Sequence, residues 1–131
     1  RHAVAHDAGV AAQAGLWGLA RSPVLAPLLE QLLREPARAW TAEDMASTVH
    51  MSRARFFRRF QDVCGEPPAQ FLQRLRMQLA AQRLHRGDSL THAAGHVGYQ
   101  PNAAFARAFQ RVIGTQPGAY QRSLRQAPAP H

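Results

Sequence analysis

The chain has 131 residues, a formal net charge of +8 and one cysteine, Cys64. This length suits one domain or two small subdomains that share a core, and a lone thiol excludes an internal disulfide. No apolar run reaches the roughly 18 residues that a membrane-spanning helix needs, so no segment is predicted to span a membrane. Because the sequence begins with Arg1 rather than Met, we expect it to be a fragment or a processed product.

The positive charge is concentrated in the second part of the sequence. From Met51 to Arg125 there are 12 arginines and three carboxylates, whereas residues 1–50 contain four arginines and five carboxylates. This asymmetry favours a polyanionic partner, and the alternative is a solvated basic face that serves solubility. Every basic residue other than histidine is arginine, whose planar fork suits bidentate contact with phosphate or guanine.

The first part of the chain reads as a connector with little regular structure. Residues 1–15 are rich in Ala and Gly, and we expect them to be poorly ordered or loosely helical. One helix is predicted near residues 24–34, and Pro36 stops it. Its apolar face is formed by Leu25, Leu28, Leu29, Leu32 and Leu33. We therefore assign residues 1–38 to a connector or N-terminal extension.

Residues 39–66 are predicted to form a first helix-turn-helix. Thr41 can cap the first of its helices, with Asp44 three residues later in a near capping-box pattern. Ser52 can cap the second helix, and Gly65 is suited to end it. The inward face of this second helix is predicted to hold Phe56, Phe60 and Val63.

A longer helix is predicted over residues 67–87, and we interpret it as a linker. Two prolines open it, and Gly87 is suited to end it. The helix-turn-helix pattern then restarts, so that residues 88–125 form a second copy followed by a short final helix. In this copy Ser89 takes the capping place, and Pro101 fits the first turn of the second helix. Residues 126–131 are expected to be a disordered tail.

Two segments of the sequence share one pattern of 16 residues. FFRRFQDVCGEPPAQF runs from Phe56 to Phe71, and FARAFQRVIGTQPGAY runs from Phe105 to Tyr120. Duplication of a small helical core explains the repeated Phe, Val and Gly. It does not explain Arg58 and Arg107, which occupy the same place in each copy and must point away from that core.

The outward positions of the two copies have the residue types that read DNA. In the first copy these positions hold Arg53, Ala54, Arg55, Phe57 and Arg58, and in the second they hold Asn102, Ala103, Ala106 and Arg107. Arginine reads guanine edges, asparagine reads adenine, and alanine can contact a thymine methyl group. Ser52 and Gln100, with the N–H groups of the helix starts, suit phosphates. The pattern predicts two helices that enter major grooves.

Three segments resemble the DNA-binding domain of the AraC-type (AraC/XylS) transcription regulators. They are WTAEDMASTVHMSRARFFRRF, RLRMQLAAQRL and HVGYQPNAAFARAFQRVIGTQPGAY, and the resemblance covers about residues 40–122. It implies an all-α fold of about seven helices, with two homeodomain-like helix-turn-helix subdomains joined by a linker helix. It also implies binding to two successive major-groove segments of double-stranded DNA.

The resemblance also implies roles for single residues. Bases would be read by Ala54, Arg55, Phe57, Arg58, Asn102, Ala103, Ala106 and Arg107. The DNA backbone would be contacted by Ser52, Arg53 and Gln100. Two residues depart from the family pattern. Pro101 stands where many members have serine, which would remove one phosphate contact, and Phe57 would either contact a thymine methyl group or pack on the neighbouring helix.

The stretch LWGLARSPVLAPLLEQLLREPARAW is similar to the connector of family members that have an N-terminal cupin-like sensor domain. The resemblance therefore implies that an effector would bind a sensor domain absent from this chain. It also implies RNA polymerase as a partner, and a cytoplasmic, nucleoid-associated location in a bacterium.

Other kinds of site have weak support. His92 and His96, like His2 and His6, have a spacing that can bind metal, but no third ligand is evident, so we expect no metal and no cofactor. Cys64 is expected to be a buried structural thiol. No catalytic pattern occurs, and we expect no enzyme. Two alternatives to the DNA-binding regulator are a basic protein–protein interaction module and the DNA-targeting part of a larger DNA-repair enzyme.

Overall fold

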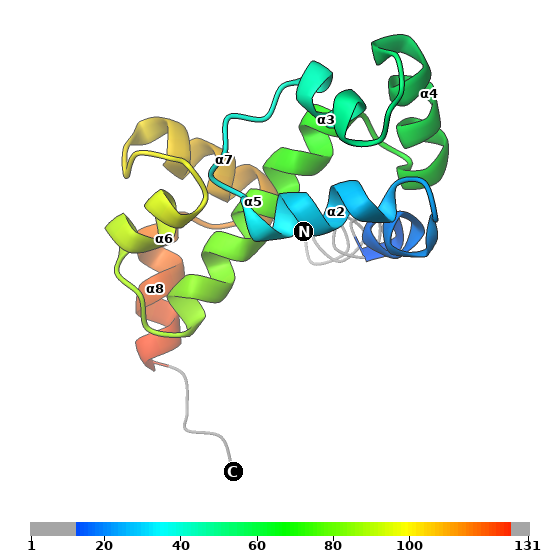
Figure 1. The fold of residues 1–131 in the computed structure, drawn as a ribbon. Helices are drawn as coiled ribbons and strands as arrows, with labels where there is room; N and C mark the ends of the chain where they lie inside the picture. Colours follow the sequence, from blue (N-terminus) through cyan, green and yellow to red (C-terminus); the bar gives the residue numbers. More distant parts are fainter. Residues whose placement is uncertain (1–12, 127–131) are drawn as a thin grey trace. The chain divides into compact units, whose positions relative to one another are not determined.

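The computed structural model describes residues 13–126, and within this range every regular element is a helix (Figure 1). A helical segment over residues 13–21 is followed by α2 (Ala26–Arg34), α3 (Ala42–Thr48), α4 (Arg53–Cys64), α5 (Pro68–His85), α6 (Leu90–His96), α7 (Ala103–Ile113) and α8 (Pro117–Gln126). The pairs α3–α4 and α6–α7 are the two helix-turn-helix motifs, and α5 is the linker helix. The predicted all-α fold is confirmed.

The chain divides into two compact units. The first ends at Arg74 and the second begins at Leu75, so that the boundary falls within α5. Each unit contains one helix-turn-helix. The first half of α5 completes the first unit, and the second half begins the next.

The first unit begins its helices with the caps that the sequence predicts. At α3 the Thr41 hydroxyl accepts a hydrogen bond from the Asp44 N–H at 3.0 Å, and the Asp44 carboxylate accepts one from the Thr41 N–H at 3.2 Å. This is a complete capping box. At α4 the Ser52 hydroxyl accepts a hydrogen bond from the Arg55 N–H at 3.2 Å. These bonds fix the starting residue of both helices.

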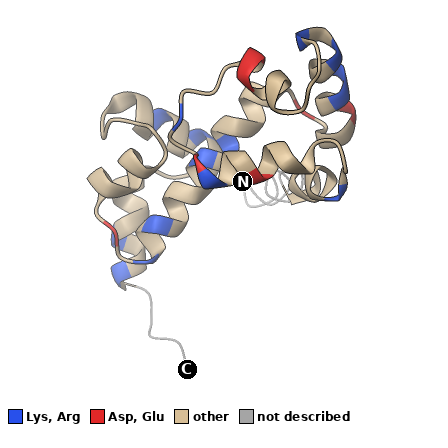
Figure 2. Cartoon of the chain, viewed as in Figure 1, with Lys and Arg blue, Asp and Glu red and all other residues tan. Residues whose placement is uncertain are grey.

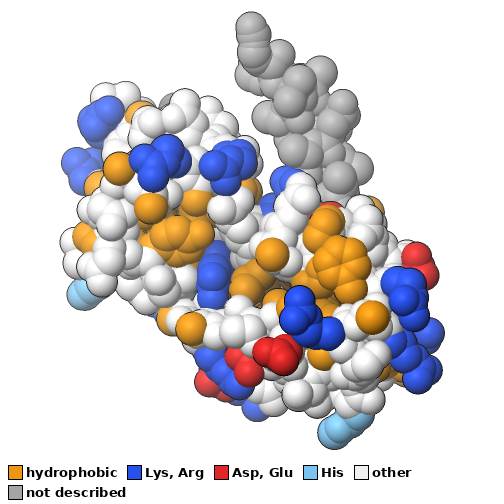
Figure 3. Space-filling model, turned by 90° about the horizontal axis from the view of Figure 1, so that it is seen from above, with side chains coloured by type: hydrophobic (Ala, Val, Ile, Leu, Met, Phe, Trp, Pro, Cys, Tyr) orange, Lys and Arg blue, Asp and Glu red, His pale blue; other side chains and the backbone are white. Residues whose placement is uncertain are grey.

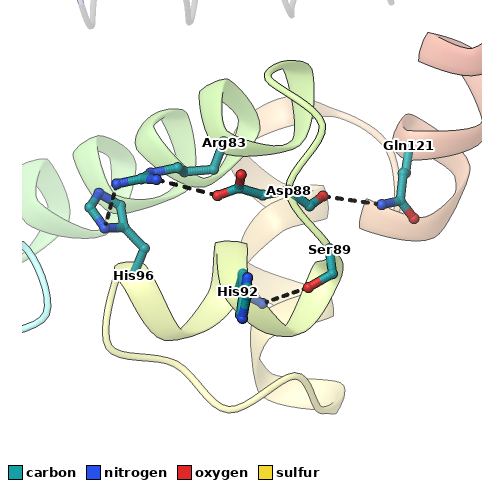
Figure 4. A network of polar contacts seen from close by, with 6 residues as sticks. All are labelled: Arg83, Asp88, Ser89, His92, His96 and Gln121. Carbon is teal, nitrogen blue, oxygen red and sulfur yellow. Dashed lines mark hydrogen bonds and ion pairs between the residues drawn. The ribbon is translucent and has the colours of Figure 1, made fainter.

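The second unit repeats this construction with one change. Ser89 caps α6 by accepting a hydrogen bond from the His92 N–H at 3.1 Å (Figure 4). At α7, however, Asn102 is the cap, and its Oδ1 accepts from the N–H groups of Ala104 and Phe105. The prediction that Pro101 lies in the first turn is therefore wrong. An asparagine side chain satisfies two free N–H groups there, so the helix begins at Ala103.

Glycines end the second helix of each motif as predicted. Gly65 and Gly114 have φ angles of +90° and +99°, in the left-handed region that favours glycine. The turn within each motif also needs a positive φ. Gly98 supplies it in the second copy at +83°, whereas His50 adopts +59° at the equivalent place in the first.

Each unit has its own hydrophobic core beneath the second helix of its motif. In the first unit Phe56 and Phe60 are fully buried, with ring centroids 5.6 Å apart. The core of the second unit consists of Met77, Ala80, Ala81, Leu84, Ala93, Ala94, Val97, Phe105, Ala108 and Phe109. The predicted inward Phe positions are thus confirmed in both copies. Val63 and Val112 are only half-buried, and Cys64 takes the buried place next to Val63.

The helical segment over residues 13–21 packs against the end of α4. A Cβ placed on Gly18 would lie 2.5 Å from the carbonyl oxygen of Val63, and one on Gly15 would lie 2.9 Å from that of Cys64. Real Cβ atoms do not approach backbone oxygens so closely, so the two glycines permit a close approach of backbones. The segment is therefore built into the first unit and is more than a connector.

The predicted apolar face of the helix at residues 24–34 and the predicted start of the tail are each only partly confirmed. Four of the five predicted leucines near α2 are buried, but Leu33 is 45% exposed, because the inward face of this helix is narrower than the leucine pattern suggested. The predicted behaviour of residues 1–12 lies outside the described residues. The tail was expected from residue 126, but Gln126 ends α8, and the remainder also lies outside the described residues.

A polar network joins α5, α6 and α8 in the second unit (Figure 4). Arg83 forms an ion pair with Asp88 at 3.4 Å, and its other terminal nitrogen lies 3.2 Å from Nδ1 of His96. The Gln121 amide donates a hydrogen bond to the Asp88 carbonyl oxygen at 3.4 Å. These contacts hold the loop between α5 and α6, which contains the Ser89 cap.

Candidate nucleic-acid interface

Arginines are concentrated in the N-terminal half of α4 (Figure 2), and their side chains are exposed. Phe56 and Phe60 face the core, so the side chains between and before them must face outward. All the predicted contact residues of this copy are exposed, namely Ser52, Arg53, Ala54, Arg55, Phe57 and Arg58. The structure therefore places these residues together on a single helix and its cap.

The arginines of α4 are available to an external partner. Within the described residues, Arg53, Arg55 and Arg58 have no carboxylate partner. The only acidic residue of α4 is Asp62, which lies in its C-terminal half. The free N–H groups and the positive end of the helix dipole also lie at the N-terminal end. The surface is thus suited to an anion at the start of α4.

Phe57 is one of the exposed large hydrophobic residues of the described chain, with 46% of its surface accessible. It lines an open hollow of about 740 Å³ together with Ala42, Arg53, Ala54, Phe56 and Arg58. Phe57 therefore lies beside Ala42 of α3 with nearly half of its surface accessible, and both alternatives for its role, contact with a thymine methyl group and packing on the neighbouring helix, stay predictions. Figure 3 shows that, in the view from above, exposed hydrophobic side chains have arginines beside them.

The corresponding surface of α7 is less basic. Arg107 and Ala103 are exposed, and Ala106 is half-buried. Gln100 is exposed ahead of the helix. Asn102 is exposed too, but its Oδ1 is used as the helix cap. Only its side-chain amino group is left to donate to a partner.

Two further residues, Arg59 of α4 and Ala42 of α3, belong to this surface but were not among the predicted contact residues. Arg59 is exposed and adds a fourth arginine to this helix. Comparison of the two copies did not indicate Arg59, because the equivalent residue of α7 is Ala108, which is buried. Ala42 lies in the first turn of α3 and lines the Phe57 hollow. No pattern within one helix could have identified it, since the contact joins two helices.

Of the residues considered for other chemistry, Cys64 and His96 have structural roles. Cys64 is buried as predicted, and burial, followed by the nearby Glu66 carboxylate, raises the pKa of its thiol to about 11. The thiolate that nucleophilic chemistry needs is therefore scarce at neutral pH. His96 contacts Arg83, and His92 is exposed. The pair His2 and His6 lies outside the described residues.

No helix among residues 13–126 combines the length and the apolar composition needed to cross a bilayer.

Known proteins with the same architecture share much of this sequence. Residues 45–123 match the family described as "Helix-turn-helix domain". Over 105 residues the chain is 42% identical to the RCS-specific HTH-type transcriptional activator RclR of Escherichia coli K12, covering 79% of this chain and 37% of that protein. It is 42% identical over 108 residues to a Streptomyces lividans protein described as an AraC-like transcription regulator, covering 82% of this chain and 35% of that protein.

The chain thus spans little more than a third of the length of these relatives. Among solved structures, it resembles the DNA-binding domain of AdpA, a global transcriptional factor crystallised in complex with a target DNA. The TM-score is 0.74 at 32% identity, covering 80% of this chain and 96% of that one. The match over residues 45–123 begins within α3 and includes α4, the linker helix and the whole second helix-turn-helix. The chain therefore belongs to the AraC-type family of helix-turn-helix domains.

Proposed function

We propose that this chain binds double-stranded DNA with sequence specificity, as the DNA-binding part of a transcription regulator. In this proposal α4 and α7 are the recognition helices, and each enters a major-groove segment with its N-terminal half. Arg55 and Arg58 read bases from α4, and Arg107 reads them from α7. Ser52, Arg53 and Gln100 contact the DNA backbone.

The observation that carries the proposal is the exposure of arginine at the same position of both second helices. Arg58 and Arg107 each lie two residues after a core phenylalanine, and both are exposed. Packing does not require arginine there. A bidentate arginine on a guanine is the commonest specific contact in the major groove. Binding to DNA is therefore the function that these features support best.

The experiment is selection of bound sites from a pool of random duplexes, followed by titration of the selected duplex and a shuffled duplex at one salt concentration. We expect the selected duplex to bind at least about 1000-fold more tightly, the lower end of the usual specificity ratio. Equal affinity for both duplexes would contradict sequence-specific binding. It would favour the basic interaction module instead, because such a module has no reason to prefer one duplex.

The family membership supports further proposals about the whole protein. We propose that the regulator acts on RNA polymerase, that its effector binds outside this chain, and that it is located with the bacterial chromosome. We propose that this domain acts by binding and not by catalysis. A pull-down with the full-length protein and purified RNA polymerase on promoter DNA tests the first of these proposals.

A further inference from the structure

We propose that Phe57 is a specificity-determining residue, which recognises the 5-methyl group of one thymine in the half-site bound by α4. The inference rests on the proposed DNA-binding function and assigns a base feature to one side chain. Phe57 has no aromatic counterpart in the second copy, where the equivalent residue is Ala106.

Phe57 is placed as an apolar contact residue and not as part of the core. Its ring is on the first turns of α4, and 46% of its surface is exposed, whereas the neighbouring Phe56 is fully buried. The hollow beside it has an apolar wall formed by Ala42 and Ala54. A methyl group that packs against Ala42, Ala54 and the Phe57 ring would lose its contact with water on the side that faces the protein. Burial of this apolar surface favours binding.

The charges around the hollow indicate which partner brings that methyl group. Arg53 and Arg58 line the same hollow, and Arg55 is exposed on the same helix. An apolar protein or lipid surface would have to bury these cations without compensation, which costs free energy. The partner must therefore offer an apolar group to Phe57 and hydrogen-bond acceptors to the arginines. The major groove of DNA offers both, because phosphates and guanine edges accept hydrogen bonds from arginine and the thymine methyl group is exposed there.

The chemistry of the four bases makes the assignment specific. In the major groove only thymine presents a methyl group, and apolar side chains such as phenylalanine contact it. The other bases present no methyl group there, so a phenyl ring gains no equivalent apolar contact with them. Phe57 therefore favours thymine through contact with its methyl group.

The test uses deoxyuridine, which pairs like thymidine but lacks the methyl group. Each thymine of the α4 half-site is replaced in turn, and wild type, Phe57→Ala and Phe57→Leu are titrated with every duplex at one salt concentration. For wild type we expect one replacement to weaken binding about fourfold, the value of one buried methyl-sized group. For Phe57→Ala the same replacement has no effect, and Phe57→Leu retains part of it. Replacements in the other half-site affect all three proteins equally.

Three results would overturn the inference while the proposed function stands. They are a selected half-site without thymine, a wild-type protein that is indifferent to every replacement, and a Phe57→Ala protein that loses the same factor on thymine and uracil duplexes. If selection yields no preferred duplex, the proposed function fails and this inference fails with it. Unfolding midpoints of the variants are measured alongside, and because Phe57 is exposed we expect them to equal that of wild type.

Discussion

The rings of Phe60 and Phe71 meet edge to face with their centroids 5.6 Å apart, and they join α4 to the start of α5. In the second unit Phe109 and Tyr120 meet in the same way at the same distance, and they join α7 to α8. Within each copy the first phenylalanine of the repeated pattern also contacts this pair, Phe56 with Phe60 and Phe105 with Phe109, so each unit has its own small aromatic core. The sequence repeat is a repeat of this core.

Removal of the central ring of either core should destabilise its unit. Phe60 and Phe109 are fully buried, so Phe60→Ala and Phe109→Ala are each expected to cost about 3–5 kcal/mol through lost burial and the cavity left behind. Urea unfolding monitored by circular dichroism measures this. Phe57→Ala is the matched control on the same helix and should change stability by less than about 0.5 kcal/mol. Equal stability of all three variants would mean that Phe60 and Phe109 do not lie on the buried faces of α4 and α7.

The close approach of the segment at residues 13–21 to α4 leads to a second prediction. Gly18→Ala would place a Cβ 2.5 Å from the Val63 carbonyl oxygen, a backbone atom that cannot move aside like a side chain. We expect a loss of about 1–3 kcal/mol. Gly95→Ala is the control, because Gly95 lies within α6 with nothing within 4 Å of its added Cβ. That change should stabilise by about 0.5–1 kcal/mol through helix propensity. Stabilisation by both changes would show that the segment is not packed on α4.

The equivalent arginines should act each in its own half of the DNA site. Arg58→Ala and Arg107→Ala are expected to cost about 1–3 kcal/mol of specific binding, and to relax specificity at one or two base pairs. Selection repeated with each variant identifies those base pairs. Arg58→Lys and Arg107→Lys are the controls, since lysine keeps the charge but not the bidentate fork. If the lysine variants keep full specificity and the alanine variants lose affinity on all sequences alike, both arginines are phosphate contacts.

His96 should make the stability of the second unit depend on pH. Burial, and then the Arg83 guanidinium, lower the pKa of His96 below its usual range. The folded state therefore disfavours the protonated ring, so the stability that His96 contributes is complete above about pH 6.5 and is lost as the pH falls through the lowered pKa. His96→Gln should unfold with a weaker pH dependence between about pH 7 and 5. His92→Gln, exposed on the same helix, is the control. Parallel stability curves for wild type and His96→Gln would contradict this.

Local signals in the sequence were sufficient for most of the fold. Thr41, Ser52 and Ser89 cap helices because the capping bond joins residues three apart, which a sequence pattern can contain. Gly65 and Gly114 end helices for an equally local reason, their positive φ. The two helix-turn-helix motifs follow from these signals and from the spacing of the phenylalanines.

The structural features that could not be predicted from the sequence depend on contacts between residues that are distant along the chain. The glycines at positions 15 and 18 belong to no pattern in the sequence, but they allow backbone contact with Val63 and Cys64, almost 50 residues away. Leu33 fits the apolar spacing of α2 but is exposed, because burial depends on which face of the helix the rest of the unit covers. In the candidate site the outward positions of Arg58 and Arg107 were predictable from the repeat. The use of Asn102 as a cap was not, because it depends on where α7 begins.

The central claim is that the two motifs read two patches of one duplex. The two motifs are separated along the chain only by the turn after α4, the 18-residue helix α5, about 27 Å long, and the short loop that follows it. Successive major-groove openings on one side of DNA lie about 34 Å or 10–10.5 bp apart. Two recognition helices on so short a connection are therefore expected to need half-sites at this one spacing.

The most direct measurement is a gel-shift titration at one salt concentration on two duplexes, the selected site and the same site with about 5 bp inserted between its halves. The insertion turns the second half-site to the opposite side of the DNA. We predict that specific affinity falls to the level that one helix-turn-helix alone provides, and that Arg107→Ala has no further effect on the inserted duplex. Equal affinity for the two duplexes would show that only one motif reads DNA, or that α5 does not hold the two motifs at a fixed spacing.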